Sequence, residues 1–204
     1  MQPGAPRRGR PRTVTDRDLI AAYMRVHLES DPARWTLGDV ARSAGVVPGT
    51  IVQRFGSKRG LMEAALRQGL ADLAASVEAA RELAASDPEA ALAAIVAALV
   101  PSELTPVQMA NSIAQLHVEL SDPLLRPLVE QHMAIAAAAF GAVLAAAIDQ
   151  GVLCVGEDMA IGEVATTAWS GALVRFAITG AGSTRAWVSR AIADVLAPYR
   201  VLRT

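Results

Sequence analysis

Segment 36–61 constrains the fold of this 204-residue chain most strongly, because signals that start and stop helices recur in it at short intervals. Thr36 can cap a helix by accepting a hydrogen bond from the backbone N–H of Asp39, whose negative charge suits the first helical turn. Gly45 supplies a residue that tolerates positive φ at the end of that helix. Pro48 suits the first turn of the next helix, where its missing N–H costs nothing. The spacing predicts two short helices joined by a tight turn.

The second of these helices, expected at Pro48 to Arg54, begins with short side chains. We expect its outward residues to be Pro48, Gly49, Thr50 and Gln53. Short side chains let a helix approach base edges closely, and the amide of Gln53 can pair with adenine in the major groove. Phe55 is expected to anchor the helix from behind. The segment is therefore typical of a DNA-binding helix-turn-helix.

A third helix start follows directly. Ser57 can act as its cap, which leaves Lys58 and Arg59 at the helix N-terminus. Backbone N–H groups and side-chain cations can together hold a DNA phosphate at such an end. Lys58 is the only lysine of a chain rich in alanine and arginine, so its place at a helix start, and not its rarity, supports this prediction.

The same segment resembles the N-terminal domain of the tetracycline-repressor-like (TetR) family of bacterial transcriptional regulators. Members of that family typically read Ala-Gly-Val-Ser-x-Gly-Thr-Leu-Tyr-x-x-Phe-x-Ser-Lys-x-x-Leu. Two positions depart from the pattern: Val47 replaces a serine that usually caps the recognition helix, and Val52 replaces a tyrosine whose hydroxyl usually reaches phosphate. Both substitutions remove a polar contact. The matching residues are Ala44, Gly45, Val46, Gly49, Thr50, Phe55, Ser57, Lys58 and Leu61.

The charge of the chain is divided between its two ends. Residues 1–60 contain 11 Lys and Arg against 5 Asp and Glu, a net +6, whereas residues 61–204 contain 8 against 15, a net −7. A basic end of this kind is an electrostatic footprint for nucleic acid that the overall charge of −1 conceals. A basic tail that serves solubility is the alternative interpretation.

Residues 1–14 are too rich in proline, glycine and positive charge to fold alone, and we expect a disordered basic arm. Its Arg-Gly-Arg-Pro sequence resembles the core of an AT-hook, which lays arginines into the minor groove. Insertion into the minor groove and loose phosphate contact both remain open. Taken together, the expected DNA-binding residues are Arg8, Arg10, Arg12, Thr36, Pro48, Gly49, Thr50, Gln53, Arg54 and Lys58.

Helical periodicity and capping signals continue along the whole chain, and no strand pattern competes with them. We predict an all-α protein with a three-helix domain at 15–60 and a larger regulatory, ligand-binding and dimerisation domain at 61–204. Pro127 should bend or offset the helix in which it lies. The expected helices outside the helix-turn-helix are 15–29, a long helix after Ser57, 88–100, 106–120, 123–150, 158–179 and 184–200.

The carboxy-terminal part resembles the regulatory domain of the same family. This resemblance implies a homodimer in which the last two helices pair with those of a second subunit, so that two recognition helices face a palindromic operator. Small residues and an apolar stripe on these helices permit such pairing. They are Ala165, Ala168 and Ala172, followed by Val188, Ile192, Val195 and Tyr199.

A ligand cavity is expected inside this regulatory domain, and its apolar lining favours a hydrophobic or aromatic effector. Ordinary core packing is the alternative for the apolar members of the set. Arg175 could orient an acidic or carbonyl-bearing ligand, or it could bond a helix terminus or Glu119. The expected ligand-binding residues are Met109, Ile113, Leu116, His117, Phe140, Trp169 and Arg175.

Catalysis, metal binding and membrane insertion find little support in the sequence. The three histidines are scattered, Cys154 is the only cysteine, and no phosphate loop or metal-ligand spacing appears. The apolar run at 133–148 is shorter than the ~20 residues that span a bilayer, so we expect a buried helix. We therefore expect a cytoplasmic, non-enzymatic regulator without a cofactor, most simply a repressor whose effector changes the spacing of its DNA-binding helices. An all-helical enzyme, or a DNA-binding protein without an effector, are the alternatives.

Overall fold

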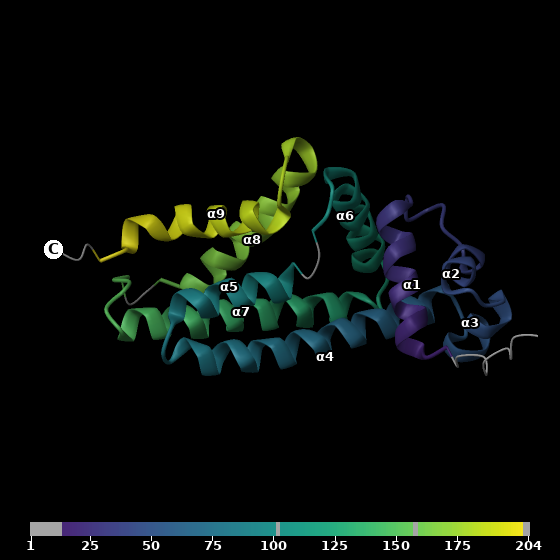
Figure 1. The fold of residues 1–204 in the computed structure, drawn as a ribbon, viewed down its shortest axis with the longest axis horizontal. Coiled ribbons are helices and arrows are strands. Elements are labelled where there is room, and N and C mark those ends of the chain that lie inside the picture. Colours follow the sequence, from purple (N-terminus) through teal and green to yellow (C-terminus); the bar gives the residue numbers. More distant parts are fainter. Residues whose placement is uncertain (1–13, 101–102, 157–158, 202–204) are drawn as a thin grey trace, which may run out of the picture.

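The computed structural model describes residues 14–100, 103–156 and 159–201. Within these ranges helices are the regular secondary structure, and an isolated bridge joins Leu153 and Arg200, so the prediction of an all-α fold is confirmed. Figure 1 shows the elements in order. They are α1 (Asp16–Glu29), α2 (Leu37–Ala44), α3 (Pro48–Phe55), α4 (Lys58–Ala84), α5 (Pro88–Leu99), α6 (Pro106–Ser121), α7 (Arg126–Asp149), α8 (Ile161–Thr179), α9 (Thr184–Leu196) and the 3-10 helix η1 (Ala197–Tyr199).

Three helices begin with a complete capping box. In each, a threonine hydroxyl accepts from the third backbone N–H of the helix, and the side chain at that position accepts from the backbone N–H of the threonine. α5 begins after Asp87, whose carboxylate accepts from the Ala90 N–H at 2.9 Å. The predicted starts of α1, α2, α5 and α6 are therefore confirmed. The capping boxes are Thr15 with Asp18, Thr36 with Asp39, and Thr105 with Gln108.

Three predicted bounds were wrong. α7 begins at Arg126 and not near residue 123, because Asp122 folds back on its own segment and accepts from the Leu124 N–H at 2.8 Å. Pro127 then occupies the first turn of α7, where its missing N–H costs no helical hydrogen bond. α9 stops at Leu196 because Pro198 cannot donate a helical hydrogen bond, and η1 follows. α8 begins at 161 and not at 158, after a turn closed by the Met159 N–H and the Gly156 carbonyl.

The molecule is elongated, with a small helical head at one end and a larger body at the other (Figure 1). α1, α2 and α3 form the head around a core that includes Leu19, Tyr23 and Ile51. α4 runs from the head into the body, so its first residues, such as Leu61, pack in the head core while Leu73 and later residues pack in the body core. The head core also takes Leu125 from the segment before α7.

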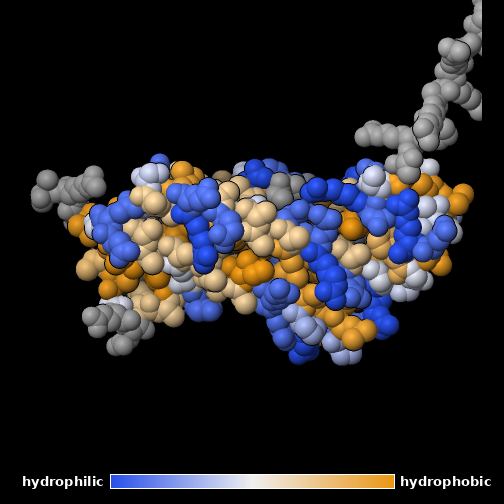
Figure 2. All heavy atoms as spheres, turned by 90° about the horizontal axis from the view of Figure 1, so that it is seen from below, coloured by the Kyte–Doolittle hydropathy of each residue, from blue (hydrophilic) through white to orange (hydrophobic). Residues whose placement is uncertain are grey.

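α7 is the central helix of the body. It is long and apolar enough to cross a membrane by composition alone, but its apolar side chains form much of the body core. Phe140 and Val143 are fully buried against neighbouring helices, which agrees with the expected core helix. On the face shown in Figure 2, polar groups interrupt the apolar surface along the length of the molecule.

α7 and α8 approach so closely that their backbones touch. A Cβ atom on Gly162 would lie 2.6 Å from the carbonyl oxygen of Ala137 and 2.9 Å from the Cα of Gly141. Only hydrogen fits at that point of α8, so glycine is needed there. Small residues thus set the distance between these two helices.

Candidate nucleic-acid interface

The turn between α2 and α3 has the geometry that its sequence predicts. Gly45 has φ of 69°, and its backbone N–H donates to the carbonyls of Ala41 and Arg42. The Val46 N–H closes the turn on the Ala41 carbonyl at 2.9 Å, and its side chain packs against the head core. These bonds hold α2 and α3 as one unit.

One face of α3 packs into the head core, and the other face is exposed to solvent. Ile51 is fully buried, while Pro48, Gly49 and Gln53 are exposed and Thr50 is half-buried. Phe55 is half-buried behind the helix, as expected. DNA contact by the outward residues stays a prediction.

The two positions that depart from the family pattern both face solvent. Val47 is the N-cap residue of α3, is 68% exposed and provides no side-chain cap. Val52 is 47% exposed. The recognition helix therefore starts without the side-chain hydrogen bond that α2 receives from Thr36.

Ion pairs surround the head. Arg54 at the end of α3 lies 2.6 Å from the carboxylate of Asp16 on α1. In the α2 cap, hydrogen bonds from Thr36 and then from Arg42 hold the pKa of the Asp39 carboxyl below its ordinary value. Exposed pairs of this kind add little stability and can exchange partners with phosphate, so the expected DNA contact of Arg54 requires it to leave or share Asp16.

The Lys58 ammonium contacts other groups of the protein, whereas a phosphate contact was expected to need a free ammonium. Its Nζ donates to the backbone carbonyls of Trp35, at 2.9 Å, and Pro32, at 3.2 Å. The same atom lies 3.8 Å from the centre of the Trp35 ring. Ser57 caps α4 as expected by accepting from the Gly60 N–H. Sequence reasoning missed Trp35, because nothing local indicates a contact between residues 23 positions apart.

A polar contact joins the head to the body between α1 and α6, and sequence reasoning missed this too. The side-chain amide of Asn111 donates to the Leu28 carbonyl at 2.9 Å. Nearby, burial lowers the pKa of His27 and raises the pKa of Glu119, and burial together with the Glu119 charge raises the pKa of Tyr23. The junction thus buries several titratable groups.

The predicted ligand residues differ in their exposure to solvent. Met109, Phe140 and Trp169 are buried, Ile113 is half-buried, and Leu116 and His117 are exposed on α6. α6 thus turns part of its predicted face to solvent, and ligand binding by this set of residues stays a prediction. Sequence reasoning also missed His132, which stacks on Trp169 with ring centroids 6.2 Å apart and whose pKa is lowered by burial. No described residue accepts a hydrogen bond from the buried Nε1 of Trp169.

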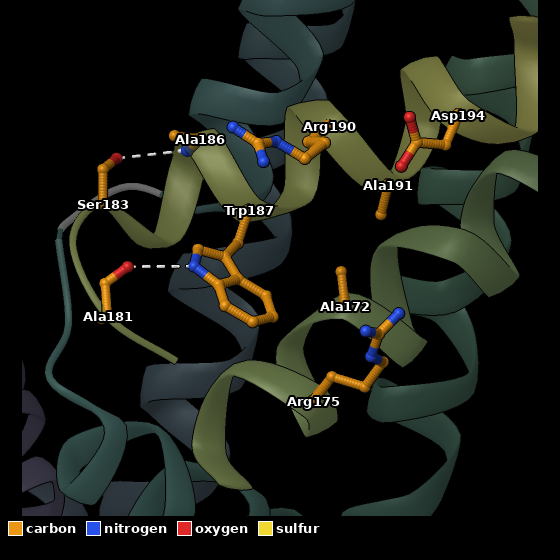
Figure 3. Close-up of a pocket in the computed structure, with 9 residues that line it drawn as sticks. All are labelled: Ala172, Arg175, Ala181, Ser183, Ala186, Trp187, Arg190, Ala191 and Asp194. Carbon is orange, nitrogen blue, oxygen red and sulfur yellow. Dashed lines mark hydrogen bonds between the residues drawn. The ribbon is translucent and has the colours of Figure 1, made fainter. Parts of the chain in front are cut away.

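Arg175 instead borders a groove of about 460 Å³ between α8 and α9. Figure 3 shows its guanidinium on the α8 side, with Arg190, Asp194 and Trp187 contributed by α9. The Trp187 Nε1 donates to the Ala181 carbonyl at 3.0 Å, which fixes the indole at one end of the groove. The predicted alternative of a contact with Glu119 is not formed in the described structure, where Gln115 donates to Glu119.

The small and apolar residues expected at a dimer interface lie mostly inside the protomer. Ala165 and Ala172 of α8 and Val188 and Ile192 of α9 are buried in the body core. Ala168, Val195 and Tyr199 are partly buried against the same core. The four buried residues pack the last two helices onto the body, so their assignment to a subunit interface was wrong. Subunit contact by the three partly buried residues stays a prediction.

Two further points concern the basic arm and the possible binding of a metal ion. Arg8, Arg10 and Arg12 of the basic arm lie outside the described residues. Within the described ranges, no group of three His, Cys, Asp or Glu side chains could hold a metal ion.

The chain resembles known regulatory proteins in sequence and in fold. Residues 19–65 match the family described as bacterial regulatory proteins, tetR family. The HTH-type transcriptional regulator BetI of Burkholderia cenocepacia is 32% identical over 123 residues, which cover 60% of this chain and 62% of BetI. The match therefore spans less than two thirds of that relative's length.

Solved structures extend the likeness over nearly the whole chain. A TetR transcription regulator from Haloarcula marismortui superposes with a TM-score of 0.70 at 18% identity, over 91% of this chain and 98% of that chain. FadR of Thermus thermophilus, a TetR-family repressor solved with lauroyl-CoA, gives a TM-score of 0.56 at 18% identity, over 93% and 97% of the two chains. At these identities the structures establish the fold.

Proposed function

Because this chain belongs to the TetR family of bacterial regulatory proteins, we propose that it is a ligand-responsive transcriptional repressor that binds a palindromic operator as a homodimer. The exposed face of α3 carries the proposal. This helix is held in a fixed turn by Gly45, and it presents Gln53 and short side chains outward from a basic end of the chain. A helix with these properties fits the major groove.

The proposed DNA contacts fall into two kinds. Gln53 and Thr50 read base edges, with Pro48 and Gly49 allowing close approach. Thr36 and Arg54, with Arg8, Arg10 and Arg12 of the arm, contact the backbone or the minor groove and set the register. Gln53→Ala should therefore relax sequence preference, whereas loss of an arm arginine should weaken binding to all sequences equally.

We propose that the dimer still uses the last two helices, but through the outward face of α8. Gly171, Val174, Arg175 and Ile178 follow the spacing of one helix face. All four are exposed, Val174 by 47% and Ile178 by 74%. Apolar side chains exposed this far are better explained by a partner than by solvent.

The proposed effector is a hydrophobic small molecule bound within the body. Support comes from the buried Nε1 of Trp169, which no described residue satisfies, and from the stacked His132 beside it. An effector that supplied a hydrogen-bond acceptor there would remove the cost of an unsatisfied buried donor. FadR, solved with lauroyl-CoA, has a similar fold. The effector acts by favouring one dimer geometry, which α4 and the α1–α6 contact transmit to the heads.

The test begins by selecting duplexes that the purified protein binds from a random library. Fatty acyl thioesters, free fatty acids and aromatic acids are then added to the complex, and release is followed by fluorescence anisotropy. The proposal predicts that at least one compound stabilises the protein thermally and releases the duplex. If every stabilising compound leaves DNA affinity unchanged, the proposed regulation is wrong.

A DNA-binding protein without an effector is the second candidate, favoured by the exposure of Leu116 and His117, two of the residues predicted to bind the ligand. Thermal stability separates the two candidates. A ligand at 100 times its Kd stabilises the folded state by about 2.7 kcal/mol, which a thermal shift assay readily detects. A protein without an effector site would show no such shift with any compound class.

A further inference from the structure

The side chain of Lys58 turns back from the start of α4 beneath the loop that joins α1 to α2. Its ammonium donates to the carbonyls of Pro32 and Trp35 and lies over the Trp35 ring, so it has three protein partners. Trp35 is 2% exposed, and its ring packs against Tyr23 with centroids 5.1 Å apart. The ammonium therefore contacts a rigid part of the head core.

The loop that Lys58 contacts leads directly into α2. The Asp31 carbonyl closes a turn within it by accepting from the backbone N–H groups of Arg34 and Trp35. The next residue, Thr36, caps α2, which in turn fixes α3 through the Gly45 turn. Carbonyls that are partly buried need a donor, and Lys58 supplies one donor group for two of them. The position of α2 and α3 relative to α4 thus depends on this contact.

We propose that Lys58 is a positioning residue, which holds the α1–α2 loop against α4 and stays on Trp35 when DNA is bound. A phosphate contact would require the ammonium to exchange two charge-assisted hydrogen bonds and a cation–π contact for one solvent-exposed partner. Burial also lowers the pKa of Lys58, which is consistent with a partly desolvated ammonium.

Arg59 is the cation at this helix end that phosphate can reach. Its side chain is 57% exposed, and its guanidinium lies 3.9 Å from the Asp122 carboxylate. A pair at that distance and exposure holds the arginine weakly. Lys58 therefore positions the loop, whereas Arg59 is available to phosphate. Because both residues are cations at the same helix end, each variant serves as the control for the other.

The first test uses the fact that the chain contains one lysine. Protein labelled with [¹³C]lysine gives a single side-chain spin system, and the indole ring current should shift the Lys58 ε-methylene protons upfield. Adding a duplex selected by the protein should leave them shifted. Movement of this signal to an ordinary position on adding DNA, or an unshifted signal in the free protein, would overturn the proposal.

The second test compares Lys58→Met with Arg59→Gln. We expect Lys58→Met to lower the Tm by about 2–4 °C and to weaken duplex binding about tenfold at every salt concentration, without changing the salt slope. Arg59→Gln should preserve the Tm and reduce the slope of log K against log salt by about 0.9. The reverse pattern would contradict the assignment.

Two further measurements keep the outcomes distinct. Lys58→Arg retains a donor and a cation, so it should recover part of the lost Tm even if Lys58→Met folds poorly. The role of Lys58 at the interface rests on the proposed DNA binding, but the spectrum and Tm of the free protein do not. If no selected duplex binds while the ε-methylene signal is shifted upfield, the proposed function fails and the loop contact stands.

Discussion

The head and the body of this molecule are specified by different kinds of sequence information. Polar residues at fixed positions mark the starts of α1, α2 and α4 in the head, and large side chains such as Tyr23 and Trp35 fill its core. In the body, alanines and glycines let long helices approach closely, and only one capping box occurs among its described helices. Local signals thus define the head, whereas the body depends on the fit between distant helices.

Gly162→Ala should give the largest effect, because it tests packing where helices touch. The added methyl would lie 2.6 Å from the Ala137 carbonyl oxygen, and backbone atoms cannot move aside cheaply. We expect a loss of about 3 kcal/mol in the free energy of unfolding, measured by urea denaturation. Gly69→Ala on α4 is the matched control, because a methyl group added there would meet nothing within 4 Å and alanine favours helix. Equal stability of the two variants would contradict the packing argument.

The pH dependence of stability compares one histidine from each region, the buried His27 in the head and the half-buried His132 in the body. Burial lowers both pKa values, so the unfolded chain binds protons near pH 6.5 before the folded protein does. The free energy of unfolding should therefore fall as the pH drops below about 6.5, with a slope of at most about 1.4 kcal/mol per pH unit for each histidine.

His27→Gln and His132→Gln should each flatten this slope, whatever they do to the stability at pH 7.5. Glu119 acts in the opposite sense, since its raised pKa makes the folded protein bind the proton first. Comparing each variant with the parent over the same pH range cancels that contribution. Thermal unfolding from pH 7.5 to 5.5 measures the slopes, and unchanged slopes in both variants would show that burial does not hold these imidazoles neutral.

Removing one cap from each region separates stability from DNA binding. Thr36→Ala and Thr105→Ala each delete the hydroxyl of a capping box, so each should cost about 1 kcal/mol in unfolding free energy. Only Thr36→Ala should also weaken DNA binding, because Thr36 is itself a proposed DNA contact and α2 supports the proposed recognition helix. Anisotropy titrations with a selected duplex measure the DNA affinity of both variants. Equal losses of affinity would show that a cap in the body affects DNA binding as much as a cap in the head.

Val47→Ser should give the smallest effect, and it is a gain. Val47 is the exposed N-cap of α3 and lacks a side-chain cap, so serine should stabilise the head by about 0.5–1 kcal/mol. Ser43→Ala on the exposed side of α2 provides a control for a mild surface change in the same domain. A loss of stability in Val47→Ser would mean that the valine side chain makes a contact that the cap geometry does not reveal.

The contrast between head and body also explains what sequence reasoning could and could not predict. The caps, Gly45 and Pro48 predicted the head almost to the residue, because each signal acts within a few positions of itself. The Lys58–Trp35 contact and the Asn111–Leu28 bond join residues far apart, and no local pattern encodes them.

In the body, the starts of α5, α6 and α9 were predictable, but the starts of α7 and α8 and the directions of side chains were not. Apolar residues lie on more than one side of α6, so the sequence does not decide which side turns inward. Val188 and Ile192 pack in the protomer although they were assigned to an interface, and Leu116 is exposed although it was assigned to a cavity. The ligand-binding assignments share this weakness.

Binding of the full-length protein to a selected palindromic duplex and to a shuffled duplex, across a salt series, tests the assignment of α3 most directly. We predict at least about 10³-fold tighter binding to the palindrome, two half-sites about one helical turn or more apart, and a steep decline of affinity with salt. Equal and weak binding to both duplexes would contradict the assignment of α3 as a recognition helix.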